Sequence, residues 1–348
     1  MEVPETRVVN PYLFIVGCAR SGTTLLERMV DAHPEIAITH QWHTIPRVFE
    51  KRKGLTAEGL VTPELISHLL KLPWFTCMGI SREGLLKLMG NGQSVHYSDF
   101  VTGIFELYGK AQGKALVGDK TANYVRKMRT LHALWPRARF VHLIRDGRDV
   151  CLSVANWPGA YQADKPGSFV TWIEDPVSTI AFWWELNVRL GREAGSWLGP
   201  ELYYEICYEP LVNRPAEQCA ALCGFLGLPY DDAMPRYHED RTKADPEVDA
   251  GHPRLPVTTG LRDWRSQMPA EDVERFEAAA GGLLDELGYP RTFPRPRAEK
   301  LENASRIRSL LVQDPRWRRL SEGPCANEAG VSASRGAGER RSLLETGV

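Results

Sequence analysis

Residues 12–30 read YLFIVGCARSGTTLLERMV, and this stretch decides the fold. The apolar run 12–16 is rich in residues that favour strands and stops at Gly17, which predicts a buried strand. Residues 21–32 carry apolar side chains at helical spacing and end just before Pro34, which predicts a helix. The turn between the two elements would direct free backbone N–H groups and the positive end of the helix dipole at one point. The stretch therefore predicts an anion site.

The loop follows the phosphate-loop pattern G-x-x-x-x-G-K-[ST] at every fixed position except one, because Thr23 stands where the lysine belongs. A cation is found earlier in the loop, at Arg20. A nucleotide triphosphatase would lose its main charge on the β- and γ-phosphates by this change, whereas an enzyme for a different phosphoanhydride would not. The alternative is an ordinary strand–turn–helix with a glycine-rich corner. The residues predicted to bind the anion are Arg20, Ser21, Gly22, Thr23 and Thr24.

A second candidate anion site lies in residues 139–153, which read RFVHLIRDGRDVCLS. Residues 140–144 predict another buried strand, and a helix follows it. Arg145 would lie at the carboxyl end of that strand, where open α/β sheets bind ligands. Ser153 follows eight residues later, about two helical turns on, so it is expected to face the same cleft. Together the two segments predict a ligand with phosphate-like groups at two separated points. The alternative is that Arg145 and Arg148 only form surface ion pairs with Asp146 and Asp149.

These two motifs together resemble the sulfotransferases that use 3′-phosphoadenosine 5′-phosphosulfate (PAPS), in particular the tyrosylprotein and bacterial-type branch. In that family the first loop holds the 5′-phosphosulfate, and the second segment holds the 3′-phosphate through its Arg and Ser, here Arg145 and Ser153. The resemblance covers roughly residues 10–290. It includes a lysine-bearing segment at 118–121, and the late loop at 260–265 that closes over the nucleotide. The donor-binding residues that it adds are Gly260, Arg262 and Trp264.

One segment departs from the tyrosylprotein branch, whose members carry G-E-E-T-R after the first helix with a glutamate as base. The matching stretch here reads THQWH, so His40 or Gln41 occupies the glutamate position. His40 and His43 become the candidate bases, since histidine can accept a proton near neutral pH. Asp119 is a competing candidate. Alternatively, the two histidines are polar loop positions without a catalytic role.

The predicted reaction is in-line transfer of a sulfuryl group from PAPS to an acceptor hydroxyl, or to an amine, which leaves 3′,5′-phosphoadenosine (PAP). Positioning and electrostatics should dominate such a reaction, and no metal is expected. Lys120 would neutralise the bridging or sulfuryl oxygens. The predicted alternatives are a kinase-like phosphotransferase of the phosphate-loop type and a non-catalytic nucleotide-binding module. The residues predicted to be catalytic are Arg20, His40, His43 and Lys120.

The composition limits the class of protein and its partners. The chain has 348 residues, 43% of them hydrophobic and 25% charged, with a net charge of −1. Neither nucleic acid nor an anionic membrane surface is therefore expected as a partner. The seven cysteines show no paired metal spacing. No signal peptide and no apolar run long enough to span a membrane is found, so we expect a cytoplasmic protein. The acceptor (small molecule, glycan or peptide) and the oligomeric state stay open.

Strands that alternate with helices along the chain predict a three-layer α/β/α fold of the phosphate-loop type with a central parallel sheet. Further strands are expected at 115–117 and 201–208, and a long helix from 176 to about 197. Residues 1–296 are predicted to form the sulfotransferase domain. Residues 297–348 are predicted to be a C-terminal extension that is largely disordered, because its last part has almost no large apolar side chains. Within it, the roughly helical spacing of Leu301, Ile307, Leu310 and Leu311 allows a short helix around 298–312.

Overall fold

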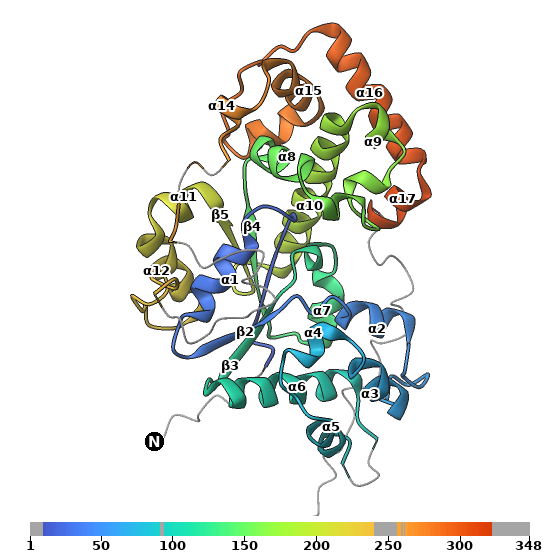
Figure 1. Cartoon of the computed structure of the whole chain (residues 1–348), viewed down its shortest axis with the longest axis vertical. Helices are drawn as coiled ribbons and strands as arrows, with labels where there is room; N and C mark the ends of the chain where they lie inside the picture. Colours follow the sequence, from blue (N-terminus) through green and yellow to red (C-terminus); the bar gives the residue numbers. More distant parts are fainter. Residues whose placement is uncertain (1–9, 91–93, 240–255, 259, 261, 322–348) are drawn as a thin grey trace, which may run out of the picture.

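The computed structural model describes residues 10–90, 94–239, 256–258, 260 and 262–321. Its central sheet has five strands in the order β2-β3-β1-β4-β5, and all neighbouring strands are parallel (Figure 1). The predicted parallel sheet is therefore confirmed. The strands are β1 (Leu13–Gly17), β2 (Ile36–His40), β3 (Leu116–Lys120), β4 (Arg139–Ile144) and β5 (Tyr203–Cys207).

Several helices begin and end close to the positions that the sequence predicts. The long helix expected from 176 to about 197 spans Pro176–Leu198. It begins there because the Asp175 carboxylate accepts a hydrogen bond from Ser178 N at 2.9 Å and so caps the helix. The described helices are α1 (Thr23–Asp31), α2 (Ile45–Lys51), α3 (Pro63–Leu69), α4 (Pro73–Thr76), α5 (Arg82–Leu88), α6 (Tyr97–Gln112), α7 (Met128–Leu134), α8 (Gly147–Ala155), α9 (Thr171–Glu174), α10 (Pro176–Leu198), α11 (Tyr208–Asn213), α12 (Pro215–Leu226), α14 (Trp264–Gln267), α15 (Ala270–Glu286), α16 (Ala298–Gln313) and α17 (Pro315–Ser321), with the 3₁₀ turns η1 (Ala122–Arg126), η2 (Pro158–Tyr161) and η3 (Pro166–Ser168).

Helices cover both faces of the sheet, which confirms the three-layer fold. Side chains of β1 point alternately to opposite faces, as they must in a strand. Phe14 and Val16 belong to one buried core, together with side chains of α6 and α7. Leu13 and Ile15 belong to another, together with side chains of α1 and α12. All five residues of β1 are buried, so this strand lies at the centre of the molecule.

The candidate site lies where the order of the strands reverses, between β1 and β4. From β1 the chain leaves through α1 towards β2 at one edge, and from β4 it leaves towards β5 at the other edge. Open α/β sheets bind ligands in the crevice that such a reversal opens at the carboxyl ends of the strands. Strands β1 and β4 approach each other closely here, since a Cβ atom at Gly17 of β1 would lie 2.6 Å from the carbonyl oxygen of Leu143 of β4.

A third core lies beyond the carboxyl ends of the strands and contains side chains of α8, α10, α15, α16 and α17 (Figure 1). Ile307 and Leu311 of α16 are buried in it, and Trp317 of α17 packs on Phe169 with 5.4 Å between the ring centroids. Residues 298–321 are thus packed helices: α16 agrees with the short helix expected around 298–312, whereas α17 was not predicted. Residues 322–348 lie outside the described part.

The sequence did not predict two elements that border the site. Strand β2 begins two residues after Pro34, and no strand was predicted there. Helix α11 begins immediately after β5, and its first residue, Tyr208, was predicted to be the last residue of the strand 201–208. In the described part of the chain, no helix is long and apolar enough to cross a bilayer.

Candidate active site

The loop between β1 and α1 wraps around the predicted anion position. Gly22 caps α1 with a φ of 101°, and Arg20 also has a positive φ, 73°. A Cβ atom on Gly22 would lie 2.5 Å from the ring of Tyr208, so a glycine is needed for space as well as for conformation. The first turn of α1 carries no acidic side chain. The N–H groups of Leu25 and Leu26 bond to the carbonyl oxygen of Gly22, which leaves those of Thr23 and Thr24, at the start of the helix, suited to an anion.

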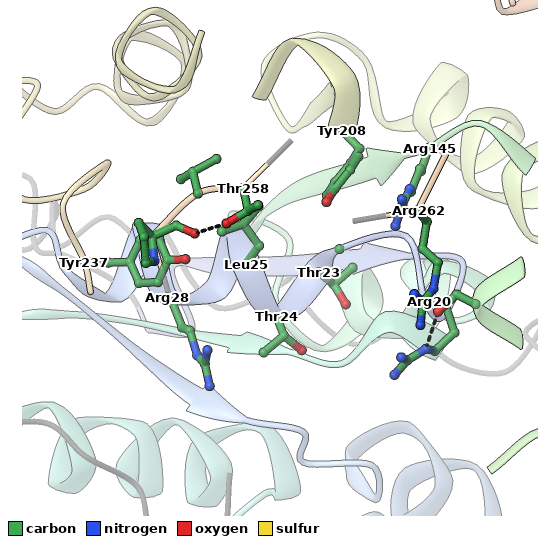
Figure 2. Close-up of a pocket in the computed structure, with 14 residues that line it drawn as sticks. Arg20, Thr23, Thr24, Leu25, Arg28, Arg145, Tyr208, Tyr237, Thr258 and Arg262 are labelled. Carbon is green, nitrogen blue, oxygen red and sulfur yellow. Dashed lines mark hydrogen bonds between the residues drawn. The ribbon is translucent and has the colours of Figure 1, made fainter. Parts of the chain in front are cut away.

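A cavity of about 380 Å³ opens beside this loop. Its described lining holds arginine, hydroxyl and apolar side chains and no carboxylate. Three guanidinium groups, of Arg20, Arg145 and Arg262, gather at one end of the cavity, and Tyr237 and Thr258 lie at the other (Figure 2). Such a cavity favours an anionic ligand. The lining residues are Arg20, Gly22, Thr23, Thr24, Leu25, Arg28, Arg145, Ser153, Tyr208, Tyr237, Pro256, Val257, Thr258 and Arg262.

The two segments that were predicted to form separated anion points meet directly. Arg20 Nε donates a hydrogen bond to Ser153 Oγ at 3.1 Å, although the residues are 133 positions apart (Figure 2). They converge because β1 and β4 are paired and parallel, so their carboxyl ends share one edge. Burial, together with the positive charges of Arg262 and Arg145, lowers the pKa of Arg20. An incoming anion would relieve this repulsion, so the cluster is suited to bind one.

Arg145 is held rigidly at the same end of the cavity. Its guanidinium carbon lies 4.1 Å from the ring centroid of Tyr208, and its Nη2 lies 3.5 Å from an Asp149 carboxylate oxygen. Its buried Nε has no hydrogen-bond partner among the described residues. Burial raises the pKa of Asp149 to about 6, although Arg145 acts in the opposite direction. Arg145 therefore keeps donor capacity for a ligand.

Lys120, at the end of β3, lies behind the loop and not in the cavity wall. Its side chain is 1% exposed, and its Nζ contacts Glu27 Oε2 at 2.8 Å and Thr24 Oγ1 at 3.3 Å. Of these three residues, only Thr24 lines the cavity. Lys120 thus reaches the ligand position through the hydroxyl group of Thr24.

Asp119, the competing base candidate, lies buried away from the cavity lining. Its Oδ2 accepts hydrogen bonds from Thr39 Oγ1 at 2.9 Å and from Trp42 N at 3.1 Å. Burial raises the pKa of this carboxyl group to about 6. These contacts fix the turn after β2, which is the segment that carries the candidate histidines.

His40 and His43 occupy the two ends of this turn. His40 is the last residue of β2, and its backbone pairs in register with Lys120 at the carboxyl edge of the sheet. The side chain of His40 lies outside the described part. His43 is exposed and is not among the residues that line the cavity. The role of either histidine as a base stays a prediction.

Comparison with known proteins agrees with this geometry. A family model described as "Sulfotransferase family" matches residues 11–232. The chain belongs to the sulfotransferase family. A protein-tyrosine sulfotransferase of Drosophila melanogaster is 25% identical over 315 residues, which cover 86% of this chain and 56% of the fly protein. The chain therefore spans little more than half the length of that relative.

Two further proteins are similar to this sulfotransferase. Protein-tyrosine sulfotransferase 1 of Danio rerio is 25% identical over 309 residues, which cover 85% of this chain and 79% of the fish protein. The solved sulfotransferase domain of the Synechococcus PCC 7002 olefin synthase superposes with a TM-score of 0.52 at 22% identity, covering 83% of this chain and 98% of that domain. At this level of identity the structure supports the fold alone.

The cavity of this sulfotransferase fits PAPS, the donor of the family. Two buried polar atoms, Ser21 Oγ and Arg145 Nε, have no partner within the described residues, and both belong to the predicted anion segments. The arginine cluster suits phosphate and sulfate oxygens, which guanidinium groups bind in a forked geometry. Leu25 and Val257 add apolar surface that suits a purine ring. Among the described residues, no group of three or more His, Cys, Asp or Glu side chains could hold a metal ion.

Not all of the residues predicted to bind the donor line the cavity. Arg262 does, but Gly260 is exposed and stands outside the lining. Trp264 is buried, and the guanidinium carbon of Arg148 lies 3.6 Å from the centroid of its ring. Its Nε1 donates a hydrogen bond to Asp146 Oδ2 at 3.0 Å. This tryptophan anchors the segment that carries Arg262. Its direct contact with the donor stays a prediction.

Sequence reasoning missed several residues of the cavity wall. Tyr208 was seen only as part of a late strand, yet it packs on both Gly22 and Arg145. Arg28 lies one helical turn beyond Thr24 on α1, so the helical spacing from the loop was the available signal. Tyr237 and the segment 256–258 gave no signal, because only the folding of distant segments brings them to the cavity.

Proposed function

We propose that this sulfotransferase transfers the sulfuryl group of PAPS to a hydroxyl group of a peptide or protein acceptor. The observation that carries the proposal is the arginine-lined cavity without a carboxylate in its described wall, at the carboxyl edge between β1 and β4. The names of the relatives, protein-tyrosine sulfotransferases, support a peptide or protein as acceptor and tyrosine as the first hydroxyl to test.

Each group of the site has a role in this reaction. PAPS supplies the sulfuryl group, and its 5′-phosphate carries the charge that develops as the bond from sulfur to the bridging oxygen breaks. Arg20, Thr23 and the N–H groups of the loop would stabilise that charge, because fixed donors in a site closed to water stabilise charge more strongly than water does. Arg145 and Ser153 would hold the 3′-phosphate and so fix the donor in line with the acceptor. The acceptor oxygen bonds to sulfur and gives up its proton to a base.

We propose His40 as that base. The supporting observation is its place beside Lys120, at the carboxyl edge where the other predicted residues converge. His43 serves as the matched control, since it lies three residues further along the same turn and its side chain is exposed. His40→Ala should lower kcat at neutral pH by about a hundredfold or more, the usual contribution of general base catalysis, whereas His43→Ala should not. Equal activity in the two variants would refute the choice of His40.

The proposed function is tested by incubating the purified protein with PAPS labelled on sulfur and a panel of acceptors. The panel contains a tyrosine peptide, the same peptide with phenylalanine in place of tyrosine, a serine peptide and a simple phenol. We expect label on the tyrosine peptide and none on its phenylalanine counterpart. Arg20→Ala should abolish transfer while the circular dichroism spectrum stays unchanged.

Other outcomes would support the two alternatives. Transfer of phosphate from ATP that requires Mg²⁺ would identify a kinase-like phosphotransferase. Binding of PAP without transfer to any acceptor would identify a nucleotide-binding module. Full turnover in Arg20→Ala would contradict the assignment of the loop.

A further inference from the structure

Helix α1 presents two side chains to Lys120. Thr24 and Glu27 are three residues apart and therefore lie on the same face of the helix. Lys120 Nζ lies 2.8 Å from Glu27 Oε2 and 3.3 Å from Thr24 Oγ1. The ammonium group is thus held between a carboxylate and a hydroxyl group that lines the cavity.

This ion pair is almost entirely withdrawn from water. The Lys120 side chain is 1% exposed and that of Glu27 is 10% exposed. A buried ammonium group is costly unless a carboxylate and hydrogen bonds compensate it. Within the described part of the chain, Glu27 is the one carboxylate within 4.0 Å of Lys120 Nζ. Without Glu27, no carboxylate of the described residues would lie within ion-pair distance of this ammonium group.

The ion pair lies where it can act on the reaction. Lys120 ends β3 and Thr24 belongs to the first turn of α1, so both lie at the carboxyl edge beside the loop. The chain contains a second contact of the same kind at the opposite end of α1, between Asp31 and Lys114, whose charged atoms are 3.9 Å apart. That second pair also links α1 to the chain next to β3, but it lies away from the cavity and serves as a control.

We propose that Glu27 is a positioning residue of the sulfuryl transfer, which holds the ammonium group of Lys120 against the Thr24 hydroxyl. In this role Glu27 touches neither donor nor acceptor. Lys120, placed by Glu27, stabilises negative charge on the oxygens of the group being transferred. The inference rests on the proposed function, and it gives a role in the reaction to a carboxylate on α1 that belongs to neither anion motif.

The test compares Glu27→Gln, Glu27→Asp and Asp31→Asn with the wild-type protein. We measure kcat and KM with labelled PAPS, the Kd of PAP by calorimetry, and the melting temperature. Glu27→Gln should lower kcat by about tenfold to a hundredfold, the effect expected when a catalytic group is misplaced by about 1 Å. The Kd of PAP should change by less than about threefold, since the arginine cluster holds the nucleotide. Glu27→Asp should recover part of the loss in kcat.

A double-mutant cycle separates positioning from a structural role. If Glu27 acts through Lys120, Glu27→Gln should not reduce kcat further in a Lys120→Met background. Asp31→Asn should keep the wild-type kcat even where its melting temperature falls. If Glu27→Gln does not fold, Glu27→Asp and the double variant, which holds no unpaired buried ammonium group, provide the same comparison.

The results that overturn the inference differ from those that overturn the function. Wild-type kcat in Glu27→Gln, or losses in kcat that simply add in the cycle, would remove Glu27 from the reaction. An equal fall in kcat for Asp31→Asn would show that any α1 ion pair has the same effect. Failure of the wild-type protein to transfer sulfate to any acceptor would instead remove the proposed function itself.

Discussion

Lys165 is a buried cation whose replacement should make the stability of the protein less dependent on pH. Its Nζ donates to Asn123 Oδ1 at 2.7 Å and lies 5.5 Å and 5.8 Å from the ring centroids of Trp157 and Trp183. No carboxylate of the described residues lies within ion-pair distance of it. Burial, together with the positive charge of Arg126, lowers the pKa of Lys165 from 10.5 to about 7.

The sign and size of the effect follow from this change in pKa. Between pH 7 and pH 10.5 the folded protein binds fewer protons at Lys165 than the unfolded chain does, so stability rises with pH across this range. The fall in the pKa of Lys165 from 10.5 to about 7 destabilises the folded protein by about 5 kcal/mol below pH 7, because each pKa unit corresponds to about 1.4 kcal/mol. At pH 9 the solution is about 1.5 pH units below the ordinary pKa of 10.5, so the remaining destabilisation is about 2 kcal/mol. Lys165→Met removes the titrating group, so its advantage over the wild-type protein should be about 3 kcal/mol larger at pH 6 than at pH 9.

Urea denaturation of both proteins at pH 6 and pH 9, followed by tryptophan fluorescence, gives the four free energies of unfolding that are needed. Contributions that do not titrate, such as the lost contact with Asn123, cancel in the comparison between pH values. Lys127→Met, which removes a partly exposed lysine paired with Glu50, is the control and should show no such dependence. The same difference between Lys165→Met and wild type at both pH values would refute the reasoning.

Three further substitutions test the site and the C-terminal helices. Gly22→Ala places a Cβ 2.5 Å from the ring of Tyr208 at a φ of 101°, so PAP binding should be lost while the circular dichroism spectrum is kept; unchanged affinity would contradict the loop geometry. Arg145→Lys keeps the charge but loses the planar fork stacked on Tyr208, and the Kd of PAP should rise by about tenfold to a hundredfold in calorimetry; a change below threefold would argue against a forked contact. Trp317→Ala removes a buried ring from Phe169 and should lower the free energy of unfolding in urea by about 3 kcal/mol; a loss below about 1 kcal/mol would show that α17 adds little to the core.

The sequence predicted the elements whose signals are local. The strand, loop and helix around Gly22 follow from composition and spacing within a few residues, and so does the helix that Asp175 caps. Strand β2 was missed because its five residues follow a proline and form no long apolar run. Its place at the edge of the sheet depends on pairing with β3, about eighty residues away, which a single sequence does not reveal.

The sequence predicted several residues of the candidate site, but it did not predict how they are arranged in space. Arg20, Arg145 and Ser153 were identified from their motifs, but they were expected at separated points. The order of the strands brings them together, because β1 and β4 are neighbours in the sheet. Tyr208 and Glu27 could not be identified, since the role of each depends on a side chain from a distant segment.

The central claim is that the cavity binds an adenosine that carries both a 5′- and a 3′-phosphate group. Calorimetric titration of the purified protein with PAP, and in parallel with AMP, tests it most directly, because AMP lacks only the 3′-phosphate. We expect saturable binding of PAP at one site, at least about tenfold tighter than AMP, since hydrogen bonds to a charged group contribute about 1.5–3 kcal/mol. An absence of heat with PAP, or equal affinity for the two nucleotides, would contradict the account.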